Sequence, residues 1–79
     1  MTMTLDMKGL KCPLPVLRTQ KALRSLALGA QITVLVTDPA STIDMPHFCN
    51  TSGNELLSAT RDGEIFVFTI RKACKTEEN

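Results

Sequence analysis

Residues Gly9–Pro15, with the sequence GLKCPLP, decide how the first part of this 79-residue chain folds. Pro13 disfavours the α conformation for the residue before it and pushes Cys12 toward extended geometry. In the first turn of a helix, by contrast, the missing N–H of a proline costs nothing. We therefore expect an extended segment to end at Cys12, which becomes the N-cap, and a helix to begin at Pro13 with Pro15 as its third residue.

Cys12 is the candidate functional residue of this stretch. A cysteine caps a helix poorly, but the partial positive charge of a helix N-terminus favours its thiolate. The polar approach and the two prolines indicate an exposed, rigidly held thiol, although free cysteines are often buried core residues. We expect a thiol pKa below the free value of about 8.5, but well above the lowest values near 3.5, because Pro13 and Pro15 leave only Leu14 to donate an N–H.

The composition predicts one small globular domain, which we assign to residues 1–74, followed by a frayed tail at 75–79. Hydrophobic residues make up 43% of the chain and charged residues 22%, which is typical of a folded protein. The net charge of +1 lacks the basic excess of a nucleic-acid binder, so no direct nucleic-acid binding is expected.

The chain shows neither a basic, apolar leader nor an apolar run near the ~18 residues of a membrane span, which predicts a cytoplasmic protein with no membrane span. The three cysteines, Cys12, Cys49 and Cys74, are widely spaced and form no C-x-x-C pair, so no disulfide framework is predicted. His47 and Cys49 are two positions apart, which points them to different sides of a helix. We therefore expect no metal and no other cofactor.

Periodicity predicts a strand, a helix and a second strand in the first half. Met3 and Leu5 alternate with polar residues, and Gln31–Thr37 carries Ile32, Val34 and Val36 on one face. The helix runs from Pro13 to Leu28 and closes at Gly29. Its core side is predicted to hold Val16, Thr19, Gln20, Leu23, Leu26 and Ala27. Strand, helix and strand imply a parallel pair with the helix on the Ile32 face.

The second half predicts a helix followed by a hairpin. Ser41 and Asp44 compete as N-caps, and we favour Asp44, because a start at Ser41 would place Pro46 too far into the helix. This helix contains Cys49 as a core residue and stops near Gly53. Strands at 55–61 and 64–72 are joined by Asp62-Gly63, predicted as a type I′ turn, and carry Phe66, Phe68 and Ile70 toward the core.

The order β-α-β-α-β-β and four motifs resemble the TusA-type (SirA-like) sulfur-carrier family. The motifs are Gly9–Pro15, Asp38-Pro39-Ala40, Asp44–Cys49 (DMPHFC) and Phe68–Lys72 (FTIRK). The resemblance implies an α/β (α+β) two-layer sandwich, in which two helices cover one face of a four-stranded mixed sheet. It also implies a cysteine that carries sulfane sulfur as a persulfide, which maps onto Cys12, with Pro13 and Pro15 in support.

Asp38 and Asp44 match acidic positions of the same family, but as a turn former and a helix cap they need no catalytic role. Members in the tRNA thiolation relay often carry an acidic residue between the two prolines, where this chain has Leu14. Others serve sulfur oxidation, thiosulfate use or molybdenum-cofactor maturation. The partners implied are a persulfide donor protein and a sulfur acceptor protein, so the chain, if active, is a sulfurtransferase-like carrier.

Such a carrier must dock on its partners near the thiol. The residues placed for this are Leu14, Leu17, Arg18, Lys21 and Arg24, which we call the docking face. Two alternatives stay open: a regulatory interaction module in which the CPLP turn only shapes a binding surface, and a redox switch that forms a Cys12–Cys49 disulfide.

Overall fold

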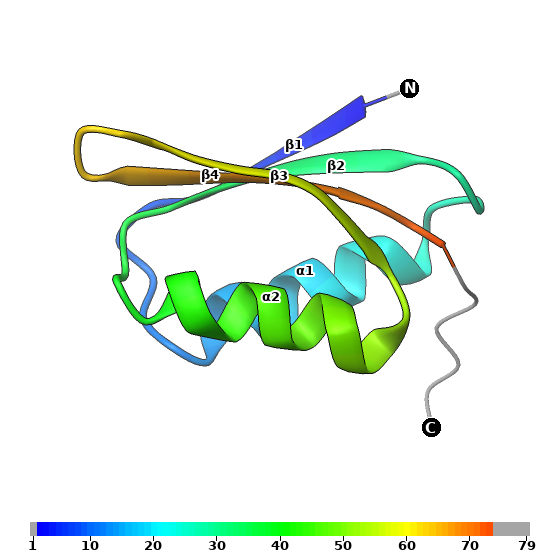
Figure 1. Ribbon diagram of the computed structural model, residues 1–79, viewed down its shortest axis with the longest axis horizontal. Helices are drawn as coiled ribbons and strands as arrows, with labels where there is room; N and C mark the ends of the chain where they lie inside the picture. The colour runs from blue at the N-terminus through cyan, green and yellow to red at the C-terminus, as the bar shows by residue number, and fades with distance from the viewer. Residues whose placement is uncertain (1, 74–79) are drawn as a thin grey trace.

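A computed structural model describes residues 2–73 as two helices and four strands, in the predicted order (Figure 1). The elements are β1 (Thr2–Met7), α1 (Leu14–Arg24), β2 (Gln31–Val36), α2 (Ser41–Ser52), β3 (Glu55–Asp62) and β4 (Ile65–Arg71). Cys74 and the tail predicted at 75–79 lie outside the described residues. Within the described part, neither helix is long and apolar enough to cross a membrane.

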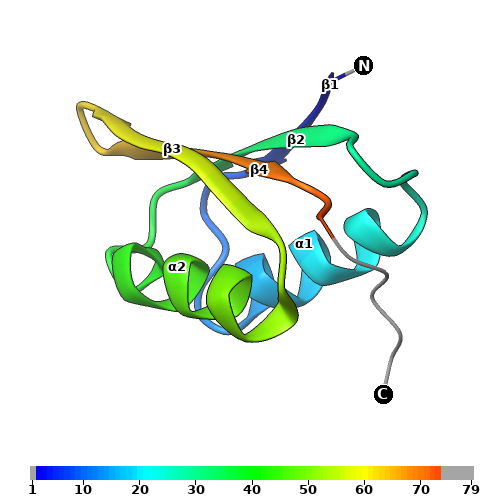
Figure 2. The same ribbon diagram turned by 45° about the vertical axis from the view of Figure 1, so that its right-hand side comes forward.

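The four strands form one mixed sheet in the order β1-β2-β4-β3. β1 and β2 are parallel, as predicted, while β4 runs antiparallel to both β2 and β3. Both helices lie against the same face of this sheet, and no element formed by residues 2–73 covers the other face (Figures 1 and 2). The predicted two-layer fold is therefore confirmed.

The core lies between the sheet and the two helices. Its buried apolar residues are Met7, Leu23, Ile32, Val34, Val36, Met45, Phe48, Cys49, Phe68 and Ile70. The register pairs Ile32 with Ile70 and Val34 with Phe68, so the inward side chains of neighbouring strands form continuous rows. The predicted strand faces and the core position of Cys49 are confirmed.

Most of the predicted core side of α1 is also confirmed. Thr19 and Leu23 are fully buried, and Val16 and Leu26 pack against the core. Ala27 is exposed, so its predicted burial is wrong. The Thr19 hydroxyl is satisfied inside the core, because its Oγ1 donates to the carbonyl of Pro15 at 2.8 Å.

α1 ends at Arg24, earlier than the predicted Leu28. The N–H groups of Ser25 and Leu26 donate to carbonyls three residues back, at 3.2 and 3.1 Å, so the chain tightens into a 3₁₀-type turn. The ammonium group of Lys72 then donates to the Leu26 carbonyl, with 2.7 Å between Nζ and O. The turn that ends the helix is thus held by Lys72, which follows β4.

α2 begins at Ser41, with Ala40 as its N-cap, so the predicted cap at Asp44 is wrong. Asp38, in the preceding loop, accepts the hydrogen bonds at the start of the helix instead. Its carbonyl accepts the N–H of Ser41 at 3.0 Å and the hydroxyl of Ser41 at 2.7 Å, and its Oδ1 accepts the N–H of Ala40 at 3.2 Å. The groups that the first turn leaves unpaired are thus satisfied from the preceding loop.

Pro46 lies inside α2, at a position that proline ordinarily disfavours. A proline there removes the hydrogen bond to the carbonyl of Thr42. The helix nevertheless continues because Met45, Phe48 and Cys49 bury their side chains against the sheet. Its predicted end is confirmed, since Gly53 is the C-cap residue with φ of 82°.

The hairpin between β3 and β4 differs from the prediction in its turn. Asp62 pairs with Ile65, so the two loop residues are Gly63 and Glu64. Gly63 has φ of 64°, but among the described residues only glycines have a positive φ. A type I′ turn needs a positive φ at both central positions, so the predicted turn type is wrong.

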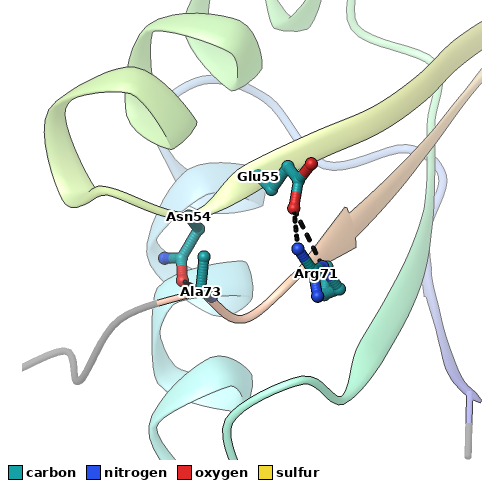
Figure 3. Close-up of polar contacts among 4 residues, drawn as sticks. All are labelled: Asn54, Glu55, Arg71 and Ala73. Carbon is teal, nitrogen blue, oxygen red and sulfur yellow. Dashed lines mark hydrogen bonds and ion pairs between the residues drawn. The ribbon is translucent and has the colours of Figure 1, made fainter.

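Polar contacts fasten the other end of this hairpin (Figure 3). Arg71 on β4 pairs with the carboxylate of Glu55 on β3, with 2.9 Å between Nε and Oε1. Just outside the two strands, the Asn54 side chain accepts the N–H of Ala73 through Oδ1 at 3.1 Å. The last described residues are therefore held to the start of β3.

The topology brings four chain segments to one edge of the molecule. The C-terminal ends of the parallel strands β1 and β2 point to this edge, and both helices begin there, at the left of Figure 1. The loop after β1 and the loop after β2 therefore lie side by side. These two loops and the first turn of α2 contain the residues of the candidate site.

Candidate functional site

Cys12, Asp38 and Asp44 meet at this edge. Cys12 lies in the loop between β1 and α1, Asp38 follows β2, and Asp44 lies in the first turn of α2. Both carboxylates contact Cys12, one through its backbone and the other through its sulfur. The site therefore depends on the pairing of β1 with β2 and on the packing of α2 beside α1.

Asp38 holds the backbone of the cysteine loop. Its Oδ2 accepts the N–H of Cys12 at 2.6 Å, while its Oδ1 accepts the N–H of Ala40. The hydrogen bond from Cys12, followed by that from Ala40, lowers the pKa of the Asp38 carboxyl, and the charge of Lys11 adds to this. A further bond from the N–H of Gly9 to the hydroxyl of Thr37, at 2.9 Å, ties the same two loops together.

Asp44 contacts the sulfur itself. The exposed thiol of Cys12 donates to Oδ2 of Asp44, with 2.7 Å between Sγ and oxygen. This hydrogen bond raises the pKa of the Cys12 thiol, and partial desolvation and the negative charges of Asp44 and Asp38 act in the same direction. The predicted lowering of the thiol pKa is therefore wrong, because a carboxylate stabilises the protonated sulfur.

The N-terminus of α1 does not direct the N–H group of Leu14 to the sulfur, contrary to the prediction. The helix begins at Leu14, and Pro13 rather than Cys12 is its N-cap, after a cis Cys12-Pro13 peptide bond. The N–H of Leu14 donates to the carbonyl of Lys11 at 2.8 Å and thus closes a turn around the cysteine. Pro15 is the second helical residue, not the third, and it is buried.

The two described cysteines have opposite environments. Cys12 is exposed, whereas the side chain of Cys49 lies in the core, where burial raises its pKa to about 11. A sulfur nucleophile must be accessible, which Cys12 is and Cys49 is not. Both thiols are free, so this arrangement gives no support to a switch between them.

The docking face predicted on α1 is exposed, but it divides into two parts. Leu14 and Leu17 expose 43% and 52% of their surface in the turns that follow Cys12. Arg18 and Lys21 line an open hollow of about 360 Å³ between α1 and β1, whose floor includes Leu5. Arg24, in the last turn of α1, is exposed at the opposite end of the helix from the thiol.

Three residues of this edge have no predicted site role. Asp38 and Asp44 match acidic positions of the family, but a turn former and a helix cap explain them from the sequence alone. Ile43, which precedes Asp44, is 73% exposed and belongs to no sequence motif. The sequence does contain a signal for the two acidic residues, since both lie near the start of the second helix. A parallel pair of strands brings this start close to the loop that contains Cys12.

The chain matches known proteins over nearly its whole described length. The family described as sulfurtransferase TusA matches residues 3–72. A "sulfur carrier protein TusA" of Pseudomonas putida is 44% identical over 68 residues, which are 86% of this chain and 85% of that protein. One of Allochromatium vinosum is 42% identical over 69 residues, which cover 87% and 91% of the two chains.

A solved structure agrees with the sequence comparisons. The crystal structure of a SirA-like protein from Desulfitobacterium hafniense superimposes with a TM-score of 0.80 and 31% sequence identity. The match covers 92% of this chain and 99% of the other. Because the family model matches residues 3–72 and the relatives named as sulfur carriers are more than 40% identical over most of the chain, this chain belongs to the TusA family of sulfurtransferases.

Proposed function

We propose that this protein is a sulfur carrier, which accepts sulfane sulfur on Cys12 as a persulfide and passes it to an acceptor protein. The observation that carries the proposal is the exposed Cys12 thiol, held at the edge where both helices begin. The relatives named as sulfur carriers support the same function. The family described as a sulfurtransferase supports the type of reaction.

The transfer is an exchange at sulfur that needs no oxidant or reductant. The thiolate of Cys12 attacks the outer sulfur of a donor persulfide, and a new S–S bond forms. The donor S–S bond breaks, and its electron pair leaves with the donor sulfur, which takes up a proton. In the delivery step the loaded carrier is the donor: an acceptor thiolate attacks the outer sulfur on Cys12, and the Cys12 thiolate leaves and takes up a proton. The protein itself needs only an accessible sulfur and a way to present it.

A carrier of this kind has two protein partners in turn, a persulfide donor and a sulfur acceptor. We propose that both approach the edge around Cys12 and contact the docking face. The exposed leucines Leu14 and Leu17 offer an apolar contact, and Arg18 and Lys21 offer positive charge. Ile43, on the α2 side of the same edge, extends the apolar part. A cytoplasmic location would keep the thiol reduced between transfers.

Intact mass after incubation with a persulfide donor tests the proposal. We expect a gain of one sulfur atom (about 32 Da for the first step from thiol to persulfide), which maps to Cys12 and is removed by a thiol reductant. Cys12→Ser should not gain this mass, whereas Cys49→Ala should load like the wild type. Loading that persists in Cys12→Ser would overturn the assignment. Full biological activity of Cys12→Ser would instead favour the interaction module.

A further inference from the structure

Asp44 contacts the sulfur of Cys12, and this contact depends on whether the carrier is empty or loaded. In the empty carrier the thiol has a proton, which it donates to Oδ2 of Asp44 at 2.7 Å. Hydrogen bonds to a carboxylate are stronger than bonds between neutral groups, so the contact stabilises the empty form. The neighbouring Asp38 makes its hydrogen bond to the backbone N–H of Cys12 instead, and this bond is present in both forms.

Loading removes the hydrogen bond to Asp44. Sγ exchanges its proton for a second sulfur atom, so it has nothing left to donate. The S–H of a persulfide is more acidic than that of a thiol, because its S–H bond is weaker and the neighbouring sulfur withdraws electron density. The loaded carrier therefore places a negative sulfur beside the carboxylates of Asp44 and Asp38, where like charges disfavour it.

The other neighbours of Cys12 do not offset this change. The N–H of Leu14 is already bonded to the carbonyl of Lys11. Pro13 and Pro15 have no N–H to offer to an anionic sulfur. Of the described charged groups, Asp44 and Asp38 act on the thiol, while the charge of Lys11 acts on Asp38.

We propose that Asp44 favours the empty carrier over the loaded one and so sets how readily Cys12 gives up its sulfur. This inference rests on the proposed function of Cys12. The exchange can be written Cys12–SH + RS–SH ⇌ Cys12–S–SH + RSH, where RSH is any thiol. The same kinds of bonds stand on both sides, so the surroundings of Cys12 decide the position of the equilibrium. A carrier that holds its sulfur weakly unloads onto an ordinary thiol acceptor.

The equilibrium can be measured with glutathione persulfide and glutathione at a fixed ratio, with the loaded fraction read by intact mass. We expect Asp44→Asn, which keeps the shape and removes the charge, to raise the loading constant about tenfold, as the loss of a charged hydrogen bond predicts. Glu55→Gln is the matched control. It removes an exposed carboxylate at the opposite end of the sheet, where β3 begins, and should leave the constant unchanged.

Salt gives a second measurement that needs no variant. Exposed charges are screened at about 1 M salt, so the loading constant of the wild type should rise with salt and that of Asp44→Asn should change much less. Asp44→Ser provides a further variant if the asparagine disturbs the fold of α2. An unchanged or lower loading constant in both variants would overturn the inference while the carrier function stands. Absence of loading in the wild type would overturn the proposed function itself.

Discussion

Cys12 shows how far a single residue can be interpreted from its neighbours in the chain. The prolines and the glycine loop correctly predicted an exposed thiol before a helix. The predicted sign of its pKa shift was wrong, because Asp44 lies 32 positions away and reaches the sulfur only through the packing of α2. A helix end acts on a thiol from a distance, whereas a carboxylate in direct contact acts more strongly.

The acidity of Cys12 is the first prediction. The pH dependence of its alkylation should show an inflection above that of an ordinary free cysteine, because Asp44 stabilises the protonated thiol. Asp44→Asn should move the inflection to lower pH and speed alkylation at neutral pH. Glu55→Gln, at the opposite end of the sheet, is the control and should behave as the wild type. An inflection that stays in place in Asp44→Asn would show that the carboxylate does not act on the sulfur.

At the scale of helices and strands, the sequence predicted the presence and order of the elements more accurately than the residues at which they end. The alternation in β2 and β4 fixed the faces of the sheet, because burial repeats every two residues. The ends depended on distant contacts. Lys72 binds the carbonyl of Leu26 in the turn after α1. Asp38 accepts the hydrogen bonds at the start of α2, although Pro46 favoured a later start. Local propensity cannot show such contacts, since the partners are far apart in the chain.

Asp38 is expected to stabilise the loop between β1 and α1. Asp38→Asn should lower the midpoint of urea unfolding at neutral pH, because it weakens the bond from the Cys12 N–H. The pKa of Asp38 is lower in the folded protein than its ordinary value of 3.8, so its contribution is present above pH 3.8. The contribution is lost as the pH falls through the lower, folded value.

Urea unfolding at a series of pH values tests this sign. The difference between the wild type and Asp38→Asn should be constant near neutral pH and should shrink below pH 3.8. Asp62→Asn, which removes an exposed carboxylate at the last residue of β3, is the control for general charge effects. A difference that grows on acidification would contradict the assignment of Asp38 as the acceptor.

Lys72 is expected to hold the end of α1 to the end of β4. It is only 7% exposed, and its ammonium donates to the carbonyl of Leu26. Its backbone bonds to the same segment, since its carbonyl accepts the N–H of Gly29 at 2.8 Å and its N–H donates to Ala30 at 2.9 Å. Lys72→Met keeps these bonds and the apolar stem, so its effect should isolate the ammonium contact.

We expect Lys72→Met to lower the free energy of unfolding by about 1 to 2 kcal/mol, because it leaves a partly buried carbonyl without its charged donor. Lys21→Met, at an exposed position, should change it by less than about 0.5 kcal/mol. Denaturant unfolding measures both. Equal effects of the two variants would mean that the contact with Leu26 contributes nothing to stability.

The overall fold could be predicted well from the sequence, but the contacts between Cys12 and the two carboxylates at the edge could not. A parallel pair and a hairpin leave few ways to build one sheet, so the order of elements implied the layers. The same topology gathers the starts of both helices beside Cys12. The proximity of Asp38 and Asp44 to Cys12 follows from this topology, so it can be predicted only after the strands have been arranged in the sheet.

Recognition of protein partners is the last prediction. Leu14→Ala should slow sulfur transfer from a persulfide-bearing donor protein about fivefold or more, as loss of an apolar anchor does, and leave loading from a small donor nearly unchanged. Leu57→Ala is the matched control. Leu57 is 42% exposed, against 43% for Leu14, but lies on the edge strand β3 at the far side of the sheet.

The charged part of the docking face should act differently from its apolar part. Arg18→Glu with Lys21→Glu reverses the charge beside the hollow near Leu5, so it should slow association most at low salt, where steering is strongest. Transfer rates from the protein donor and from a small donor, each at two ionic strengths, separate the two effects. If the wild type, Leu14→Ala and the double variant all transfer at equal rates, partners do not dock on α1. Because the thiol itself would still load, such a result would direct the search to the α2 side of the same edge, where Ile43 is exposed.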